Sequence, residues 1–338
     1  MTKPTQRPLS RRAFASTAAS AALVLTGCGA DIRRQGSPAQ TVTVKRCAEP
    51  VQYRLPQRVV AYEAGSADKL FILGLTEHVL GYVLPPANPR VSQSPWASEY
   101  AKVKLLSRDL LNRELVVDVG ADMVVAGWHS GFSVERGITP EILDELGIMS
   151  FMHTESCYNY PQFPVDVPPF EALYTDLDRL GQIFRIEKRA TNIVTDLRKR
   201  VATTRKRAPN LTPRPPVFLY DSGTRKPLTV GNQVPAHQIM EFAGARNIFA
   251  DIQGRYINVS WESIVKAQPE IIIILDYQDK PAEEKIAFLK SFPPLRSVPA
   301  IRNNNFYILN YNEAISGPQN VNGLEGFTTY MRKFQRGR

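Results

Sequence analysis

The residues with the clearest chemical potential are aromatic and polar side chains that directly follow short apolar runs. They occur in both halves of the chain, at Tyr62-Glu63, Gly127-Trp128-His129-Ser130, Tyr158-Asn159-Tyr160, Tyr220-Asp221-Ser222, Arg225 and Tyr311-Asn312. If the apolar runs are parallel strands, these residues gather beyond the strands' carboxyl ends, where open α/β sheets bind ligands. Aromatic faces combine a wide contact area with a polar handle, so the set predicts a site for a large, flat or conjugated ligand. Each aromatic residue taken alone fits a core position equally well.

Arg225, His129 and His153 raise the question of charged ligands and metals. The planar guanidinium of Arg225 could pair with a carboxylate or another anion, or it could be a solvated loop side chain. A lone histidine after a strand is more often a structural hydrogen-bonding group, and the chain has no His-rich loop or set of three histidines and a carboxylate. The sequence therefore predicts no metal site, and direct binding of zinc or manganese ions is a lesser alternative.

Motifs for catalysis are missing from the sequence. It has no Gly-x-Ser-x-Gly elbow, no His-Glu-x-x-His and no phosphate-binding loop. A binding protein is thus favoured over an enzyme, and an exported two-lobed enzyme is the alternative. The formal net charge of +10 is partly carried by the N-terminal segment and partly by one helix, so the sequence does not indicate a nucleic-acid partner.

The N-terminal segment has the pattern of an export signal. A basic start is followed by an apolar run at residues 14–25, which is too short to cross a bilayer. Leu25-Thr26-Gly27-Cys28 resembles the lipobox of bacterial lipoproteins, in which the cysteine is lipidated; an ordinary signal peptide with a cysteine at its boundary is the alternative. Ser10-Arg11-Arg12-Ala13-Phe14 resembles a twin-arginine signal, with general secretion as the alternative. We expect residues 1–27 to be a signal peptide and Cys28 to anchor the exported chain on the outer face of the cytoplasmic membrane.

The next segment, residues 28–55, is expected to be lipid anchor and tether. Residues 31–40 are polar and basic with Gly, Ser and Pro, which is typical of a flexible linker, and we expect order to begin near Pro56. Cys47 and Cys157 are the two cysteines that remain, and in an oxidising compartment they are expected to pair. Two separate thiols are the alternative.

Alternation of strands and helices predicts two parallel, doubly wound sheets. In the first lobe, residues 56–168, the expected strands are 58–62, 78–83, 123–126 and 148–153. Its expected helices are 67–73, after a turn and N-cap at Gly65-Ser66, 113–119 and 139–146. In the second lobe, residues 213–338, the expected strands are 217–220, 271–275 and 306–309. Its expected helices are 236–242, 262–267 and a C-terminal one from about Asn320.

Between these lobes lies a connecting segment, residues 169–212, with one long helix. At residues 186–206 the apolar side chains recur mostly every three or four positions, with Lys and Arg on the other face. The prediction is therefore an α/β fold with two Rossmann-like lobes, joined by one long helix and separated by a ligand cleft.

One unit of sequence occurs in both lobes. Glu114 to Val125 aligns without a gap on Glu262 to Ile273: a Glu opens a short helix, an acidic residue follows eight positions later, and a buried strand begins. A glutamate in the first turn of a helix is favourable with the helix dipole and needs no other role.

Several segments together carry a resemblance. They are Arg58-Val-Val, Leu73-Gly74-Leu, Glu114 to Val125, Ala243-Gly-Ala-Arg-Asn247-Ile-Phe and Val259-Ser-Trp-Glu262, with the single interlobe helix. Over about residues 56–335 the chain resembles the substrate-binding proteins of ABC importers for iron siderophores, haem and cobalamin. The resemblance implies that Glu114 and Glu262 dock onto arginines of the permease, and that Tyr256 lies in the cleft, where the cobalamin-binding relative has a tryptophan. It implies a monomer without intrinsic cofactor that takes a ferric siderophore, haem or a corrinoid; a surface receptor without transport is another alternative.

Overall fold

The computed structural model describes residues 41–338, apart from 86–90, 129, 161–165, 277–280 and 338. The expected signal peptide, Cys28, the linker at residues 31–40 and His129 lie outside the described residues. From Gln40 onward the chain forms one unit by its internal contacts. Within the described part of the chain, no helix combines the length and the apolar character that crossing a bilayer requires.

The described chain begins with an antiparallel hairpin of β1 (Val42–Arg46) and β2 (Glu49–Tyr53). The expectation that order begins near Pro56 is therefore wrong. The hairpin is ordered by side chains that reach the first lobe: the Tyr53 hydroxyl donates to the Ser150 carbonyl at 2.9 Å, and Arg46 donates to the Ser150 hydroxyl at 2.7 Å. At the hairpin turn, Cys47 is disulfide-bonded to Cys157, with 5.4 Å between their Cα atoms. Such a cross-link over a long loop restricts the unfolded chain.

The first lobe is built on a five-stranded parallel sheet. Its strand order is β5 (Lys104–Ser107), β4 (Val79–Val83), β3 (Val59–Tyr62), β6 (Met123–Ala126), β7 (Met149–Met152). Successive strand residues point to opposite faces. One face packs against α1 (Glu63–Ile72), α2 (Ala97–Lys102) and α5 (Pro169–Ile183), and the other against α3 (Arg113–Asp118) and α4 (Pro140–Glu145). Short 3-10 turns lie at η1 (Thr76–His78), η2 (Val91–Gln93) and η3 (Thr154–Asn159).

The second lobe has a four-stranded parallel sheet in the order β10 (Arg246–Asn247), β8 (Pro216–Tyr220), β12 (Ile271–Asp276), β13 (Phe306–Asn310). One face packs against α7 (Pro235–Phe242), α11 (Tyr311–Ala314) and α12 (Asn320–Arg336). The other packs against α8 (Trp261–Ala267), α9 (Ala282–Ser291), α10 (Pro299–Arg302) and η4 (Pro293–Leu295). A separate antiparallel pair, β9 (Leu228–Val230) and β11 (Tyr256–Asn258), completes the lobe.

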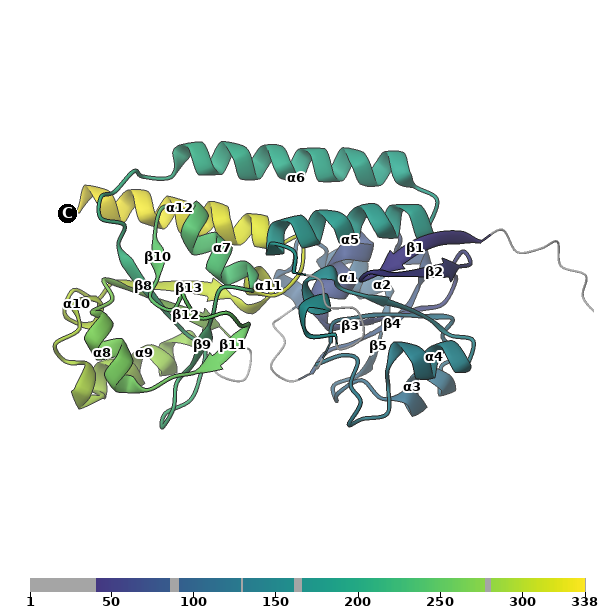
Figure 1. Ribbon diagram of the computed structural model, residues 1–338, viewed down its shortest axis with the longest axis horizontal. Coiled ribbons are helices and arrows are strands. Elements are labelled where there is room, and N and C mark those ends of the chain that lie inside the picture. The colour runs from purple at the N-terminus through teal and green to yellow at the C-terminus, as the bar shows by residue number, and fades with distance from the viewer. Residues whose placement is uncertain (1–40, 86–90, 129, 161–165, 277–280, 338) are drawn as a thin grey trace, which may run out of the picture. The chain divides into compact units, whose positions relative to one another are not determined.

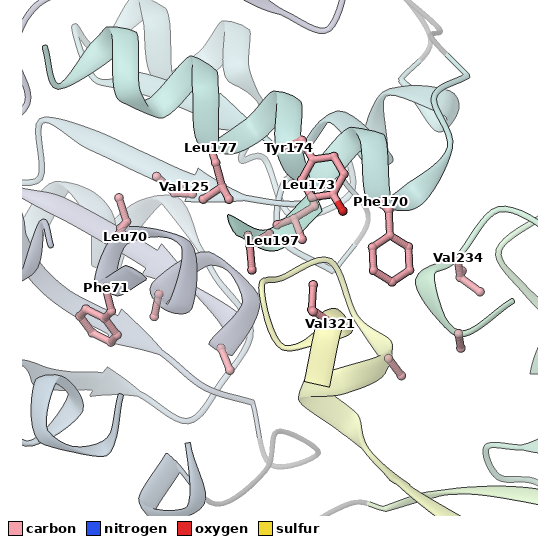
Figure 2. Close-up of a cluster of buried hydrophobic side chains, with 14 of the residues drawn as sticks. Leu70, Phe71, Val125, Phe170, Leu173, Tyr174, Leu177, Leu197, Val234 and Val321 are labelled. Atoms are coloured by element: carbon pink, nitrogen blue, oxygen red, sulfur yellow. The ribbon is translucent and has the colours of Figure 1, made fainter. Parts of the chain in front are cut away.

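The long helix is α6 (Glu187–Arg207), which follows α5 and precedes β8 (Figure 1). Its 21 residues make a rod about 30 Å long at 1.5 Å per residue. The helices α5, α6 and α12 contribute to one hydrophobic core that also contains residues of both sheets. Figure 2 shows part of this core, with Leu173 and Leu177 of α5 near Leu70 of α1 and Val321 of α12. The prediction of two doubly wound lobes joined by one long helix is confirmed, and the shared core opposes wide separation of the lobes.

One local expectation in the first lobe is wrong. Helix α1 begins at Glu63, directly after β3, and not after a turn capped by Ser66. Glu63 adopts φ +63°, a left-handed conformation that lets the chain pass from strand to helix within one residue. Ser66 therefore lies inside the helix, where its hydroxyl is free to meet another side chain.

Candidate ligand-binding cleft

A cavity of about 490 Å³ lies between the strand ends of the two lobes. The first lobe supplies Glu63, Gly65, Gly127, Trp128, Ser130, His153 and Ser156 to the lining. The second lobe supplies Arg255, Tyr256, Tyr311, Ile315 and Ser316. Most of these residues follow the carboxyl ends of parallel strands, since Glu63 follows β3, Trp128 follows β6 and Tyr311 follows β13. The volume is in the range of small-molecule sites.

The aromatic part of the lining consists of Trp128, Tyr256 and Tyr311. The indole of Trp128 is held edge-on against Tyr160, with ring centroids 5.1 Å apart. The hydroxyl of Tyr311 donates to the Glu63 carboxylate at 3.3 Å, which joins the two lobes at the cavity wall. Tyr256 is 37% exposed and presents its ring from β11. Three rings, from the segment after β6, from β11 and from α11, thus line one space.

His153 lines the cavity as a neutral imidazole. The residue is 5% exposed, and its Nε2 shares a hydrogen bond of 2.9 Å with the Ser66 hydroxyl inside α1. Burial lowers the pKa of His153 well below its usual value, and the positive charges of Lys69 and Arg255 act in the same direction. A ring that is neutral at pH 7 can offer a hydrogen-bond donor or acceptor without adding charge to the site.

Arg255 is the cation of the cavity lining. Its guanidinium forms a salt bridge of 2.6 Å with Glu155 from the other lobe and contacts the Ser156 hydroxyl at 3.4 Å. The Arg255 Nε is buried and has no hydrogen-bond partner among the described residues. Burial raises the pKa of Glu155, and the charges of Arg255 and Lys69 oppose that shift. The arginine therefore both bridges the lobes and has donor capacity left for an anionic group.

Beneath the cavity, α1 is bonded to the segment between α11 and α12. Lys69 is fully buried; its ammonium group donates to the Ser316 carbonyl at 2.9 Å and lies 3.2 Å from the Asp176 carboxylate. The two segments pack so closely that a Cβ on Gly65 would lie 2.3 Å from the Ser316 oxygen. Only glycine permits this approach. These contacts hold the cavity floor across both lobes.

Asp68, the neighbour of Lys69, predicts a pH effect on stability. Burial raises the pKa of Asp68 to about 7, against opposing hydrogen bonds from Gln319, Tyr100 and Ser94. An unfolded aspartate titrates near 4, so between pH 4 and 7 the folded state binds the extra proton and loses stability as the pH rises. We expect the free energy of unfolding to fall from pH 5 to pH 8 by about 3 kcal/mol more in the wild type than in Asp68→Asn. Urea unfolding of both chains at the two pH values measures this difference, and parallel pH dependences would contradict it.

Of the ligand-site candidates named from the sequence, Trp128, Tyr256 and Tyr311 line the cavity. Tyr62, Tyr158, Tyr220, Arg225 and Asn312 are not part of its lining. Tyr62 and Asn312 are buried, and Tyr158 is half-buried in η3. Tyr220 packs its ring near Trp261 and Phe288 in the outer core of the second lobe, which is the hydrophobic cluster between its sheet and α8, α9, α10 and η4. Arg225 is exposed in a loop. A position after a strand does not decide which way the side chain points.

Sequence reasoning missed Gly65, Ser156, Arg255, Ile315 and Ser316, and it treated His153 as a structural group. Arg255 precedes Tyr256, and a strand recognised at 256–258 would have drawn attention to it. The segment with Ile315 and Ser316 carries no local signal, because the cavity reaches it only through the packing of α1.

Among the described residues, no group of three or more His, Cys, Asp or Glu side chains is placed to hold a metal ion.

Glu114 and Glu262 lie outside the cavity, in the first turns of α3 and α8. Both are exposed: the Glu114 side chain is 69% exposed beside Arg113, and Glu262 is bonded to its own backbone amide and the Ser260 hydroxyl. Those hydrogen bonds lower the pKa of Glu262. Both carboxylates are thus accessible to a partner protein.

The profile of the periplasmic binding protein family matches residues 59–312. A vitamin B12-binding protein from Photorhabdus laumondii is 24% identical over 247 residues, which are 72% of this chain and 79% of the relative.

Solved structures of the same fold include a periplasmic binding protein from Veillonella parvula, with TM-score 0.73, 22% identity, and coverage of 87% of this chain and 98% of the other. A second comes from an ABC-type Fe3+-hydroxamate transport system of Saccharomonospora viridis, with TM-score 0.69, 22% identity, and coverage of 86% and 98%. The family match spans both sheets and the long helix between them. The chain belongs to the periplasmic binding protein family.

Proposed function

We propose that this chain is a lipid-anchored extracytoplasmic receptor that captures an iron-siderophore-type chelate, or haem or a corrinoid, and delivers it to an ABC permease. The observation that carries the proposal is the cavity at the strand ends, which both lobes line with aromatic rings and one arginine. No bond of the ligand is made or broken. The B12-binding relative and the hydroxamate-transport structure support this class of ligand.

The lining suggests how such a ligand is held. Trp128, Tyr256 and Tyr311 supply aromatic faces for a flat or conjugated surface. Arg255 supplies a planar donor group that suits a carboxylate or another anionic oxygen, and the neutral His153 supplies a further hydrogen bond. A ligand with a conjugated face and an anionic edge satisfies both parts of the lining. Because the Arg255 guanidinium already pairs with Glu155, an anionic group of the ligand competes with Glu155 for it. That salt bridge spans the two lobes.

Delivery requires that the loaded protein reach its permease in a defined orientation. The N-terminal lipobox pattern at residues 25–28 supports export and anchoring through Cys28, which keeps the receptor at the membrane surface. One exposed glutamate on each lobe, Glu114 and Glu262, would register the receptor on the permease. The core shared by the two lobes limits the hinge, so ligand binding closes the cleft by a small movement.

Tryptophan fluorescence tests ligand capture. Trp128 lines the cavity, whereas Trp261 lies in the outer core of the second lobe. A bound chromophore should therefore strongly quench the fluorescence of the wild type and of Trp261→Phe, and should quench that of Trp128→Phe far less. We expect one of a panel of ferric siderophores, haem and cobalamin to bind with Kd below about 10 µM, or roughly −7 kcal/mol. The proposal fails if no panel member binds in this range, and the cavity assignment fails if Trp128→Phe is quenched as strongly as the wild type.

A further inference from the structure

The positive charge of the chain is concentrated on two helices. Helices α6 and α12 contain eleven Lys and Arg residues against three Asp and Glu, a net charge of +8. The whole chain carries +10, of which the first 40 residues carry +5, so the rest of the chain is negative overall. Both helices pack on the core shared by the two lobes, whereas α3 and α8 pack on the opposite faces of the two sheets. Figure 1 likewise shows α3 and α8 on the side of the sheets away from α6.

The exposed ridge of α6 carries three of these cations. Lys188, Lys199 and Lys206 are separated by eleven and seven residues, which are close to three and two helical turns. They therefore lie on one stripe, opposite the buried stripe formed by Ala190, Val194, Leu197 and Val201. All three lysines are exposed, and no ion pair of theirs occurs among the described residues.

Next to this ridge, a groove of about 460 Å³ runs between α6 and α12. Its lining is polar and consists of Asp196, Lys199, Arg200, Thr203, Thr204, Arg207, Glu325, Thr328, Thr329 and Arg332. Arg200 is neutralised by Glu325 at 2.8 Å. Lys199, Arg207 and Arg332 are exposed and form no ion pair within the described part of the chain.

Hydroxyl groups complete the groove. Thr328 is 3% exposed, and its hydroxyl has no hydrogen-bond partner in the described ranges. Uncompensated cations beside threonine hydroxyls are the groups that bind phosphate esters. A ridge about 27 Å long with a polar groove along its side matches an extended array of phosphates better than a single small anion.

We infer that the basic face, defined as α6 with α12, binds the anionic surface of a phospholipid bilayer. The inference rests on the proposed lipid anchor, which would keep the protein close to a bilayer. From Cys28 the chain reaches Val42 in 14 residue steps, which span at most about 50 Å when extended, so the anchor permits the contact. Within the folded unit, the first strand β1 packs on α5, which packs on α6. A receptor resting on its basic face turns Glu114 and Glu262 away from the membrane, and membrane contact then competes with docking.

Vesicle flotation tests the inference. The chain from residue 29, which contains the folded unit beginning at Gln40, carries no lipid and is mixed with phosphatidylcholine vesicles or with vesicles containing about 30% phosphatidylglycerol. We expect binding to the anionic vesicles alone, with loss near 0.5 M salt because the charges are screened within a few ångströms. The variant with Lys199→Gln, Arg207→Gln and Arg332→Gln should bind about 100-fold more weakly.

A matched control removes three exposed cations from other elements: Lys104→Gln, Lys226→Gln and Arg296→Gln. It should bind within about twofold of the unmodified chain. Equal loss in both variants, or equal binding to neutral vesicles, would overturn the inference. Displacement by inorganic phosphate at constant ionic strength would show a soluble-phosphate site instead of a bilayer contact. None of these measurements involves the cleft ligand or the permease, so a negative result here is separate from failure of the proposed function.

Discussion

Replacing Glu114 and Glu262 together by arginine is expected to abolish ligand uptake while the purified protein keeps its ligand affinity. Both glutamates are exposed in the first turns of short helices, and neither lines the cavity. If they meet arginines of a permease, as the family resemblance implies, reversal of both charges places like charges opposite each other, which costs several kcal/mol. Docking should then weaken by at least about 100-fold. Uptake by cells and ligand titration of the purified variant measure the two effects separately.

The control reverses two other first-turn glutamates, Glu99 in α2 and Glu283 in α9. This variant has the same change in net charge and also acts in the first turns of two helices, so it accounts for helix-dipole effects of about 0.3–1 kcal/mol per site. Its uptake should match the wild type. If Glu114→Arg with Glu262→Arg transports normally, the docking role is excluded. If it loses ligand binding as well, the glutamates act on the fold or the cleft and not on the partner.

Replacing Lys69 by methionine is expected to destabilise the protein by about 3–5 kcal/mol, because it leaves a buried carboxylate unpaired. The Lys69 ammonium and the Asp176 carboxylate are 3.2 Å apart with no exposed side-chain surface, and Lys69 also donates to Ser316 from the other lobe. Burial lowers the pKa of Lys69, and Asp176 and Glu155 oppose this shift. Thermal unfolding should show a Tm lower by roughly 10 °C.

Two further variants separate the causes. Lys69→Met with Asp176→Asn removes both charges, and the asparagine oxygen can still accept from the Thr154 amide, as Asp176 does at 2.8 Å. This double variant should recover most of the loss, since a buried pair replaced as a whole is often nearly neutral. Lys102→Met removes an exposed lysine 3.8 Å from Glu99 and should cost less than about 1 kcal/mol. A Lys69→Met chain as stable as Lys102→Met would show that the buried pair does not hold the lobes together.

The sequence alone determined the parts of this protein that depend on local pattern. Buried strand residues 59–62, 123–126 and 271–275 are uninterrupted apolar runs, and Thr139-Pro140 marks the start of α4 because the cap and the proline act within one turn. The three- and four-residue spacing that defines α6 is likewise read along one segment. Two parallel sheets and the helix between them follow from such local signals and from the repeat around Glu114 and Glu262.

Only the tertiary structure decided which side chains share the cleft. Tyr220 and Tyr311 both follow strands, yet Tyr220 enters an apolar core while Tyr311 reaches Glu63, because the direction of a side chain depends on what packs against its strand end. Arg255 meets Glu155 across 100 residues of sequence, and Lys69 meets Ser316 across 247. No local pattern encodes these pairs. They arise because the shared core brings two separately folded sheet edges together, so the site is a property of packing between lobes and not of any one segment.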